Sequence, residues 1–338
     1  MSKTDISAVT LEAMQARHAD LASDVVRTSC VPLISPLMDR ALDGGQVHMK
    51  LECFQHTGTF KARGAVSVAR AIAQDQCAAG ITAASAGNHA IAAAWAARRQ
   101  GLSAKVVMQS SANPFRVARA RAEGAEVILK EGGPATFGEA ERLVRDEGRT
   151  FIHPFEGINT TLGTAGVGLE LMEDVPDLDA VVVSVGGGGL ISGVAAAVKA
   201  INPACKVYGV EPAGADSMSR SRAVGAPVTL DKVDTVADSL GPPMALPFGF
   251  AMCQAHVDDI VTVTDDQICA GMVVMQEEAK LAVEPAAGAA MAGLLSPLRD
   301  RLKGKRVGLI VCGANVDAAG YLNLMERGRG KLAELTGY

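Results

Sequence analysis

The sequence predicts an α/β protein of two lobes, each an open parallel sheet with helices on both faces. Segments of strand type and of helix type follow one another through the 338 residues, as they do in chains of βαβ units. Residues 180–185 are apolar except for Ser184, as expected of a strand that is buried on both faces. With 36 glycines and an aromatic content of only 4%, the composition favours tight βα turns over a β-sandwich.

The first half of the chain shows this alternation from its start. Residues 4–25 predict an amphipathic helix, and residues 28–33 predict an extended lead-in. The strands expected after it are residues 46–52, 80–84, 104–108 and 126–129. The helices expected after these strands are residues 60–73, 90–99, 115–123 and about 136–147.

The second half repeats the rhythm. Residues 212–247 predict mainly loops, and they contain the break Pro242-Pro243. The expected strands are residues 180–185, 206–210, 257–263 and 306–311. The expected helices are residues 190–200, about 265–281 and 284–295. No fixed-period repeat or low-complexity linker interrupts the chain, so two α/β lobes with a cleft between them are the economical architecture.

Composition and charge exclude several classes of function. The formal net charge is −5 with no basic block, so nucleic acid is not an expected partner. No uninterrupted apolar run reaches the roughly 18 residues of a membrane span, and the N-terminus lacks the pattern of a secretory signal. The seven cysteines form no CxxC pair, and the six histidines form no HExxH motif. We therefore expect a cytoplasmic protein with reduced cysteines.

Lys61 is the first candidate for chemistry. It stands in Thr57-Gly58-Thr59-Phe60-Lys61-Ala62-Arg63-Gly64-Ala65, which predicts a loop running into a helix with Thr57 or Thr59 as the cap. The positive field at a helix N-terminus lowers the pKa of a lysine, and a neutral amine is the form that makes a Schiff base with a carbonyl. Taken alone, the motif fits a solvated helix lysine better. The other motifs reverse that preference.

A glycine-rich turn is the second candidate. It joins the buried strand to a helix and consists of Gly186, Gly187, Gly188 and Gly189. Without Cβ atoms the backbone can approach a phosphate closely, and the free N–H groups at the helix N-terminus can bind it. Glu211 ends the next strand, about where a Rossmann fold places its ribose-binding acid. A nicotinamide oxidoreductase is therefore an alternative from another class. The glycines give neither GxGxxG nor a Walker-type GxxxxGK[ST] pattern, which counts against both nucleotide sites.

A polar loop at the end of another predicted strand is the third candidate. Its residues are Ser85, Ala86, Gly87, Asn88 and His89. Loops at the carboxyl ends of strands collect ligand-binding groups in open α/β sheets, and this one can hold a carboxylate through hydroxyl, amide and backbone N–H groups. An ordinary capped βα turn is the simpler interpretation of the loop considered alone.

Together these motifs resemble those of the fold-type II pyridoxal-phosphate enzymes, which share a tryptophan synthase β-like fold, and specifically the serine/threonine dehydratase (threonine ammonia-lyase) group. The resemblance runs from about Thr28 to Asp317 and keeps the order of motifs of that group. The matching segments are Lys50-Leu51-Glu52 with Gln55, residues 57–65, residues 85–89, Val185 to Leu190, Glu284-Pro285 and Cys312 to Asp317.

The resemblance implies a set of site residues and a domain division. Pyridoxal 5'-phosphate is the implied cofactor, with Lys61 as the catalytic Schiff-base lysine. The residues expected to contact the cofactor are Phe60, Lys61, Asn88, Gly186, Gly187, Gly188, Gly189, Glu284 and Cys312. Those expected to contact the substrate are Ser85, Ala86, Gly87, Asn88, His89 and Ser239. Residues 1–75 and 156–338 would form a large cofactor-binding domain and residues 76–155 a small substrate-binding domain, in a homodimer.

The implied reaction is β-elimination from a β-hydroxy amino acid such as L-threonine or L-serine, which yields a 2-oxo acid and ammonia. Lys61 would remove the Cα proton, with the cofactor as the electron sink. Cys312 would face the pyridine nitrogen, where a neutral thiol makes a weaker sink than a carboxylate does. A buried core cysteine is the alternative for Cys312. In similar racemases a serine stands at the position of Ala86, so we expect a dehydratase rather than a racemase.

Where the sequence departs from the motifs of this group, it does not determine which side chain the substrate carries. Asp238-Ser239 stands where Asp-Gly is common, and Gly163-Thr164-Ala165-Gly166 replaces a more usual Gly-Gln-Gly-Thr. A racemase, or a dehydratase of another 3-hydroxy amino acid such as hydroxyaspartate or phenylserine, is therefore kept as an alternative.

A divalent cation, Mg²⁺ or Ca²⁺, is a further possibility that the resemblance raises. The matching ligands would be Glu211, the carbonyl of Ala215 and Ser217, and Ser217 replaces a usual carboxylate.

Overall fold

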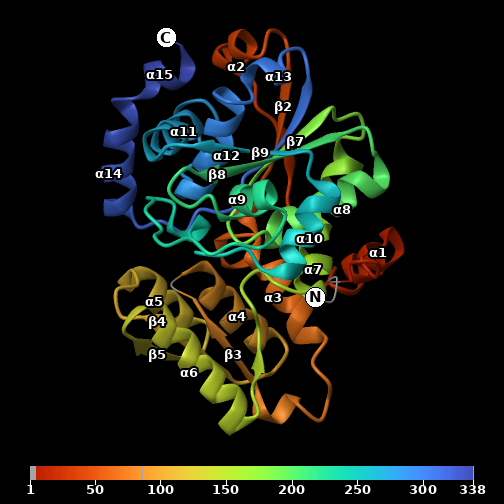
Figure 1. Ribbon diagram of the computed structural model, residues 1–338, viewed down its shortest axis with the longest axis vertical. Helices are drawn as coiled ribbons and strands as arrows, with labels where there is room; N and C mark the ends of the chain where they lie inside the picture. Colours follow the sequence, from red (N-terminus) through yellow and green to blue (C-terminus); the bar gives the residue numbers. More distant parts are fainter. Residues whose placement is uncertain (1–4, 86, 338) are drawn as a thin grey trace.

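The strands of the computed structural model, which describes residues 5–85 and 87–337, form two separate sheets with helices on both faces of each (Figure 1). This confirms the predicted fold class. In spatial order the larger sheet contains β1 (Cys30–Pro32), β2 (Gln46–Lys50), β10 (Arg306–Ile310), β7 (Ala180–Ser184), β8 (Lys206–Pro212) and β9 (Asp259–Val263). The smaller sheet contains β5 (Glu126–Lys130), β4 (Ala104–Gln109), β3 (Ile81–Ala84) and β6 (Thr150–Phe151).

The larger sheet is parallel except for its edge strand β1, which pairs antiparallel with β2. Its central strand β7 is buried along its whole length because helices cover both faces. One face carries α12 (Pro285–Leu295) with α11 (Asp265–Glu277) outside it, and the other carries α8 (Gly189–Ile201) with α7 (Ile158–Asp174) outside it. The remaining helices of this body are α2 (Pro36–Ala41), α9 (Ser217–Val224), α10 (Pro247–His256), α13 (Arg299–Leu302), α14 (Ala318–Arg329) and α15 (Leu332–Thr336).

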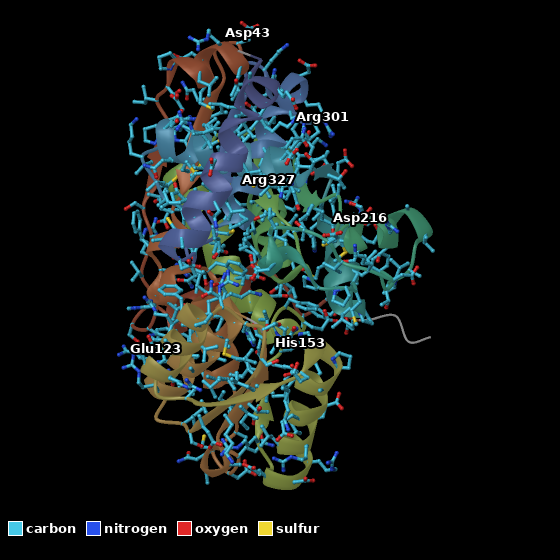
Figure 2. The ribbon with its side chains drawn as sticks, turned by 90° about the vertical axis from the view of Figure 1, so that its left-hand side faces the viewer. Asp43, Glu123, His153, Asp216, Arg301 and Arg327 are labelled. Carbon is cyan, nitrogen blue, oxygen red and sulfur yellow. The ribbon has the colours of Figure 1, made fainter. Side chains whose placement is uncertain are left out.

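The smaller sheet is wholly parallel. Helix α4 (Asn88–Arg99) packs on one face with α5 (Pro114–Ala122) beside it, and α6 (Gly132–Glu147) packs on the other. The side view shows the two bodies stacked along the longest axis, with Arg301 and Asp216 on the upper body and Glu123 on the lower (Figure 2). Helix α3 (Lys61–Arg70) contacts α7 of the upper body and α4 of the lower, and α1 (Leu11–Asp20) lies against α7.

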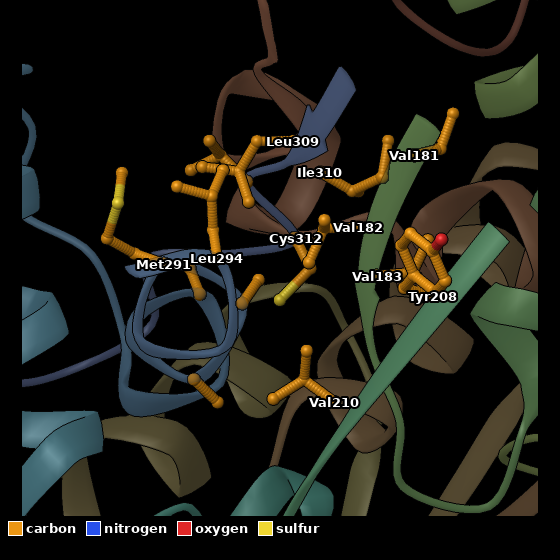
Figure 3. Close-up of a cluster of buried hydrophobic side chains, with 14 of the residues drawn as sticks. Val181, Val182, Val183, Tyr208, Val210, Met291, Leu294, Leu309, Ile310 and Cys312 are labelled. Carbon is orange, nitrogen blue, oxygen red and sulfur yellow. The ribbon is translucent and has the colours of Figure 1, made fainter. Parts of the chain in front are cut away.

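The hydrophobic core of the larger body is built from small and branched side chains at helix–sheet contacts. Val182, Val183, Tyr208, Leu294 and Ile310 all lie in it, and so does Cys312, which follows β10 in the chain (Figure 3). Glycine allows the closest of these contacts. A Cβ atom on Gly293 of α12 would lie 2.4 Å from Val210 Cγ2, so no larger residue fits there without a shift.

Most predicted elements are present within two or three residues, but several were not expected. Helix α7 was not predicted although it has 17 residues and is almost wholly buried. Helix α9 interrupts the stretch expected to be loops, and the C-terminal helices α14 and α15 were also missed. The expected helix over residues 4–25 is shorter, because α1 begins only after the Thr10 side chain, which accepts a hydrogen bond from Ala13 N.

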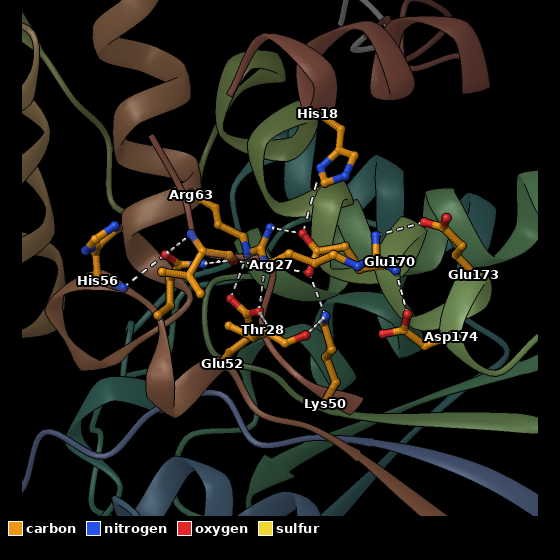
Figure 4. Close-up of polar contacts among 12 residues, drawn as sticks. His18, Arg27, Thr28, Lys50, Glu52, His56, Arg63, Glu170, Glu173 and Asp174 are labelled. Carbon is orange, nitrogen blue, oxygen red and sulfur yellow. Dashed lines mark hydrogen bonds and ion pairs between the residues drawn. The ribbon is translucent and has the colours of Figure 1, made fainter. Parts of the chain in front are cut away.

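Four charged side chains form a buried cluster between α3, α7 and the end of β2 (Figure 4). Arg63 Nη1 lies 2.7 Å from Glu170 Oε1, Arg63 Nε lies 2.8 Å from Glu52 Oε2, and Lys50 Nζ lies 2.6 Å from Glu170 Oε2. The Thr28 hydroxyl donates to Glu52 Oε1 at 2.6 Å. Burial alone would raise the pKa of Glu170, but the hydrogen bonds from Arg63 bring it below its ordinary value. Two cations and two anions therefore balance in a closed network.

No described helix is both long and apolar enough to cross a membrane. The seven cysteines are all free thiols.

Replacing Glu170 with Gln should destabilise the fold by about 3 kcal/mol or more, because it leaves Arg63 and Lys50 buried with one anion between them. Urea unfolding followed by circular dichroism measures the loss. Glu173→Gln is the control on the same helix, since Glu173 is exposed and pairs with the exposed Arg27, and it should cost less than about 1 kcal/mol. Equal losses in the two variants would contradict the role of the cluster.

Candidate active site

Two segments that are far apart in the sequence place Lys61 and Cys312 side by side. Phe60 N donates to the Cys312 carbonyl at 3.1 Å, and Ala314 N donates to the Gly58 carbonyl at 3.0 Å. Thr59 and Gly313 thereby form an antiparallel bridge. Lys61 is the first residue of α3, and the N-cap position is Phe60, with no side-chain cap, so neither Thr57 nor Thr59 is the cap that the sequence predicted. The backbone N–H of Lys61 donates to the Thr59 hydroxyl at 3.3 Å.

The turn before Lys61 has an unusual backbone. Thr57 has φ +65°, a left-handed conformation that a β-branched residue rarely adopts. Gly58 follows with φ +76°, and a Cβ atom there would lie 2.7 Å from Asn315 Oδ1. The amide of Asn315 holds the turn by donating to the Thr57 carbonyl at 2.7 Å. Backbone strain of this kind persists where surrounding contacts fix it, and such positions cluster at active sites.

The Lys61 amine has a pKa lowered to about 8. Burial is the main cause, since it disfavours the charged form, while Glu284 and the thiol of Cys312 act in the opposite direction. The direction agrees with the expectation from the sequence, but burial rather than the helix field leads. Lys61 Nζ donates to the Pro154 carbonyl at 2.5 Å and lies 5.1 Å from the centroid of the Phe60 ring.

The glycine turn between β7 and α8 presents bare backbone to the same pocket. Gly188 has φ +91°, and a Cβ atom on Gly187 or Gly189 would lie 2.3 Å or 2.7 Å from Phe155. Among the described residues, no side chain caps the N-terminus of α8. Its positive helix end and backbone N–H groups are therefore left for an anion such as phosphate.

Asn88, Glu284 and Asn315 form a buried polar network beside Lys61. Asn88 Nδ2 donates to both carboxylate oxygens of Glu284 at 2.9 Å, and Asn315 N donates to Glu284 Oε2 at 3.1 Å. Asn315 Nδ2 also donates to Asn88 Oδ1 at 2.9 Å. Burial raises the pKa of Glu284 above its ordinary value. Ser239 Oγ lies at the edge of this network, 3.5 Å from Glu284 Oε1.

Cys312 has the environment of a neutral thiol. It is buried, Ser184 Oγ donates to its Sγ at 3.5 Å, and burial raises its pKa well above the ordinary value.

The Ser85 loop borders this site, although Ser85, Gly87 and His89 do not line the pocket itself. Ser85 Oγ accepts a hydrogen bond from Gly87 N at 3.1 Å. His89 Nε2 lies 2.8 Å from the Ile152 carbonyl, and burial lowers the pKa of His89 to about 3, so the neutral ring donates this bond. Ala86 lies outside the residues that the structure describes.

Arg116 joins the Ser85 loop to the larger body. It is buried, forms an ion pair with Asp238, and donates from Nη2 to the Asn315 carbonyl at 3.1 Å. A Cβ atom on Gly87 would lie 2.8 Å from Arg116 Nη1, so the loop needs glycine at this point. The sequence reasoning missed Arg116, because nothing in its helix distinguishes it from the neighbouring arginines.

One pocket gathers most of the predicted residues. The predicted residues that line it are Phe60, Lys61, Asn88, Gly186, Gly187, Gly188, Gly189, Ser239, Glu284 and Cys312. The residues that line it without having been predicted are Phe155, Ser184, Leu190, Leu240, Pro242 and Ala286. Phe155 lies four residues after β6, where the chain crosses between the bodies, and neither the strand nor this residue was predicted from the sequence.

The predicted cation ligands lie outside this pocket, where β8 meets α9. Glu211 is buried, and its carboxylate accepts hydrogen bonds from Met218 N, Ser219 N and Ser219 Oγ. Burial raises the pKa of Glu211 to about 7. Among the described residues, no group of three or more His, Cys, Asp or Glu side chains could hold a metal ion.

These features define an α/β protein in which a lysine amine of lowered pKa and a glycine turn at a helix N-terminus line one pocket. The sequence model of the family described as pyridoxal-phosphate dependent enzyme matches residues 24–313. Phenylserine dehydratase of Ralstonia pickettii is 48% identical over 84% of this chain and 89% of that protein. L-threonine ammonia-lyase of Thermotoga maritima is 35% identical over 94% of this chain and 78% of that protein. The structure of maize serine racemase superposes with a TM-score of 0.87 at 33% identity, over 95% of this chain and 99% of that one.

The chain belongs to the family of pyridoxal-phosphate dependent enzymes. The residues of the pocket fit that cofactor. Lys61 offers an amine whose pKa is low enough for much of it to be neutral near pH 8, and the uncapped end of α8 offers backbone N–H groups to a phosphate.

The rate at which a small amine-selective reagent modifies Lys61 should follow an apparent pKa near 8, compared with about 10.4 for an ordinary lysine. Because only the neutral amine reacts, the rate of Lys61 modification should be close to its maximum at pH 9 and should fall steeply below pH 8. Mass spectrometry of the Lys61 peptide, from protein stripped of cofactor, measures it. The exposed Lys232 in the same samples reports the pH dependence of the reagent. A Lys61 profile with its midpoint near pH 10 would contradict the effect of burial.

Proposed function

We propose that this protein is an ammonia-lyase that removes the β-hydroxyl group and the amino group of a β-hydroxy amino acid. In this reaction the substrate loses a molecule of water, and hydrolysis of the resulting enamine then gives a 2-oxo acid and ammonia. The observation that carries the proposal is the buried Lys61 amine on the first residue of α3, which lines the same pocket as the glycine turn and Cys312. The relatives named as dehydratase and ammonia-lyase support the same reaction class.

Lys61 is the proposed catalytic residue. Its neutral amine takes the proton from the substrate Cα, and pyridoxal phosphate, when bound, supplies the electron sink for the pair left behind. The low pKa serves this step, since a large fraction of the amine is unprotonated near pH 8. The Pro154 carbonyl, which accepts a hydrogen bond from Lys61 Nζ, holds the amine in the pocket.

The other pocket residues bind and orient. Gly186 to Gly189 and the N-terminus of α8 are the proposed phosphate site, and Phe60 and Asn88 are the proposed contacts of the cofactor ring. The neutral thiol of Cys312 offers no negative charge with which to hold a proton on a ring nitrogen. Glu284 orients Asn88 through the two hydrogen bonds to its carboxylate.

The Ser85 loop is the proposed site for the substrate carboxylate, with Ser85, Ala86, Gly87, Asn88, His89 and Ser239 as contacts. The positive N-terminus of α4, which no side chain caps among the described residues, favours an anion there. His89 contributes by fixing the loop to the Ile152 carbonyl. In similar racemases a serine at the position of Ala86 acts on the face opposite the lysine, and alanine has no proton to give there, so this residue type favours elimination over racemisation.

The candidate substrates are L-threonine, L-serine and other 3-hydroxy amino acids. The 48% identity with a phenylserine dehydratase makes L-threo-3-phenylserine the first of these to test beside threonine and serine. We also propose that residues 1–75 and 156–338 form the large domain and residues 76–155 the small domain. The smaller sheet lies within the latter range, although the core beneath it also takes in side chains of α3. A cytoplasmic homodimer is proposed on the resemblance alone.

A bound Mg²⁺ or Ca²⁺ at Glu211, Ala215 and Ser217 is a separate proposal. The Ser217 hydroxyl is buried without a hydrogen-bond partner, so one oxygen there is free for a ligand. The Glu211 carboxylate is already engaged in capping α9, which counts against tight binding.

Saturating Mg²⁺ or Ca²⁺ should raise the melting temperature by about 2 °C or more if this cation binds the native state, and Glu211→Gln should abolish the increase. Differential scanning fluorimetry, with chelator as the reference, measures the shift. Glu326→Gln is the control at a carboxylate on α14. If neither cation raises the melting temperature, the proposed cation site is wrong.

Replacing Lys61 with Ala should lower kcat by about a thousandfold or more, because the base and the covalent anchor are both lost. Release of 2-oxo acid and ammonia from L-threonine, L-serine and L-threo-3-phenylserine measures activity. The wild-type visible absorption band, and its loss on borohydride reduction, report the anchor. Lys232→Ala should behave as wild type. A Lys61→Ala variant with wild-type turnover, or a wild-type protein that eliminates none of these substrates, would overturn the proposal.

A further inference from the structure

Four aromatic rings form a continuous row that begins at the active site. The row consists of Phe137, Phe151, His153 and Phe155. The ring centroids are 6.4 Å apart from Phe137 to Phe151, 5.7 Å from Phe151 to His153 and 4.7 Å from His153 to Phe155. Each contact is edge-to-face, with interplanar angles of 65°, 83° and 89°. Three of only eight phenylalanines in the chain lie in this ring row.

The inner end of the ring row lies at the reacting amine. Phe155 lines the pocket together with Lys61 and Asn88. The Lys61 amine donates to the carbonyl of Pro154, which is the residue between His153 and Phe155. The pocket wall beside the amine therefore includes the inner ring of the row, Phe155, and His153 packs against that ring.

His153 belongs to the row as a neutral ring. Burial, together with the charge of Lys61, lowers its pKa to about 4. Its Nδ1 accepts hydrogen bonds from Phe155 N at 3.3 Å and Glu156 N at 3.0 Å, which fixes the orientation of the ring. A neutral, fixed imidazole offers a flat surface rather than a cation, and His153 stands on the segment that crosses from the smaller body to the larger (Figure 2).

The outer end of the ring row reaches solvent. Phe151 and His153 are half-buried, and Phe137 on α6 is 39% exposed. Aromatic surface therefore leads without interruption from the amine to the outside of the molecule. The guanidinium of Arg116 is already paired with Asp238 and the Asn315 carbonyl, so it is not free to bind an acidic group on the substrate side chain.

We propose that the ring row forms the subsite for the β-substituent of the substrate, with Phe155 in contact with it and His153 packed against Phe155, and that this subsite selects an aryl group. The inference rests on the proposed function and names its substrate class as 3-aryl-3-hydroxy amino acids. A phenyl substituent packs edge-to-face against fixed rings, whereas the methyl group of threonine or the hydrogen of serine leaves their surface in contact with water.

The holoenzyme with paired substrates tests the subsite. The ratio of kcat/KM for L-threo-3-phenylserine to that for L-threonine should exceed about tenfold in the wild type and should fall by about tenfold in His153→Asn. Asn keeps a side-chain acceptor for the backbone N–H groups and removes the ring. A general loss of activity cancels in the ratio. Phe115→Leu is the matched control, since Phe115 is 36% exposed on α5 and lies outside the row.

Binding of substrates that lack a leaving group gives a second readout. L-phenylalanine and L-alanine carry no β-hydroxyl, so their dissociation constants, from the spectral change of the bound cofactor, report recognition without elimination. L-phenylalanine should bind about tenfold more tightly than L-alanine, and His153→Asn and Phe155→Leu should each narrow this difference.

The outcomes separate the two proposals. A wild-type enzyme that eliminates water from threonine or serine but shows no preference for the aryl member of either pair would overturn the subsite and leave the ammonia-lyase intact. Ratios unchanged in His153→Asn and Phe155→Leu would show that the ring row serves core packing only. A preference for L-phenylalanine over L-alanine without elimination of any substrate would support the subsite and overturn the proposed reaction.

Discussion

The buried cluster of Arg63, Glu52, Glu170 and Lys50 is the interaction on which the geometry of the site depends. It joins β2, the segment that follows β2, α3 and α7, so it fixes the helix that begins with Lys61 to the larger sheet (Figure 4). Four charges in the interior are tolerated because the two cations and two anions hydrogen-bond one another. A network of this kind has few alternative arrangements, and we infer that it holds α3 in one position between the two bodies.

In the pocket that Lys61 lines, the ionisable groups are shielded from water. Burial shifts the pKa of Lys61 downward and the pKa values of Glu284 and Cys312 upward, so each shift favours the neutral form. Hydrogen bonds from Asn88 and Asn315 offset the cost of burying Glu284. A neutral amine beside a neutral thiol suits proton removal from carbon better than an ion pair, which would hold the lysine protonated.

Contacts between the two bodies complete the site. Arg116 comes from the smaller body and reaches Asp238 and the Asn315 carbonyl of the larger, while the Pro154 carbonyl, on the crossing segment, accepts a hydrogen bond from Lys61. Two residues of the ring row, His153 and Phe155, lie on the same crossing segment. The residues proposed to meet the substrate are thus held by contacts from both bodies, and a change in how the bodies sit would alter several of these contacts at once.

The sequence by itself determined the α/β class, most strands and helices, and ten of the residues that line the pocket. Local signals suffice for these, because strand alternation, glycine turns and a lysine after a turn are features of neighbouring residues. Helix α7 shows the limit. Its glycines lower helix propensity, yet Gly163 and Gly168 let it approach Arg63 and Val194 so closely that a Cβ atom would lie 2.5 Å and 2.8 Å from their carbonyl oxygens.

Only the tertiary structure decided which groups meet. Arg116, Asn315 and the ring row gain their roles from partners more than a hundred residues away or from a crossing between sheets, and no local pattern marks them. The low pKa of Lys61 was expected from the helix end, but its main cause, burial, is a property of the assembled pocket. Chemistry follows from residue type and local spacing, whereas desolvation and long-range contacts exist only once the chain has folded.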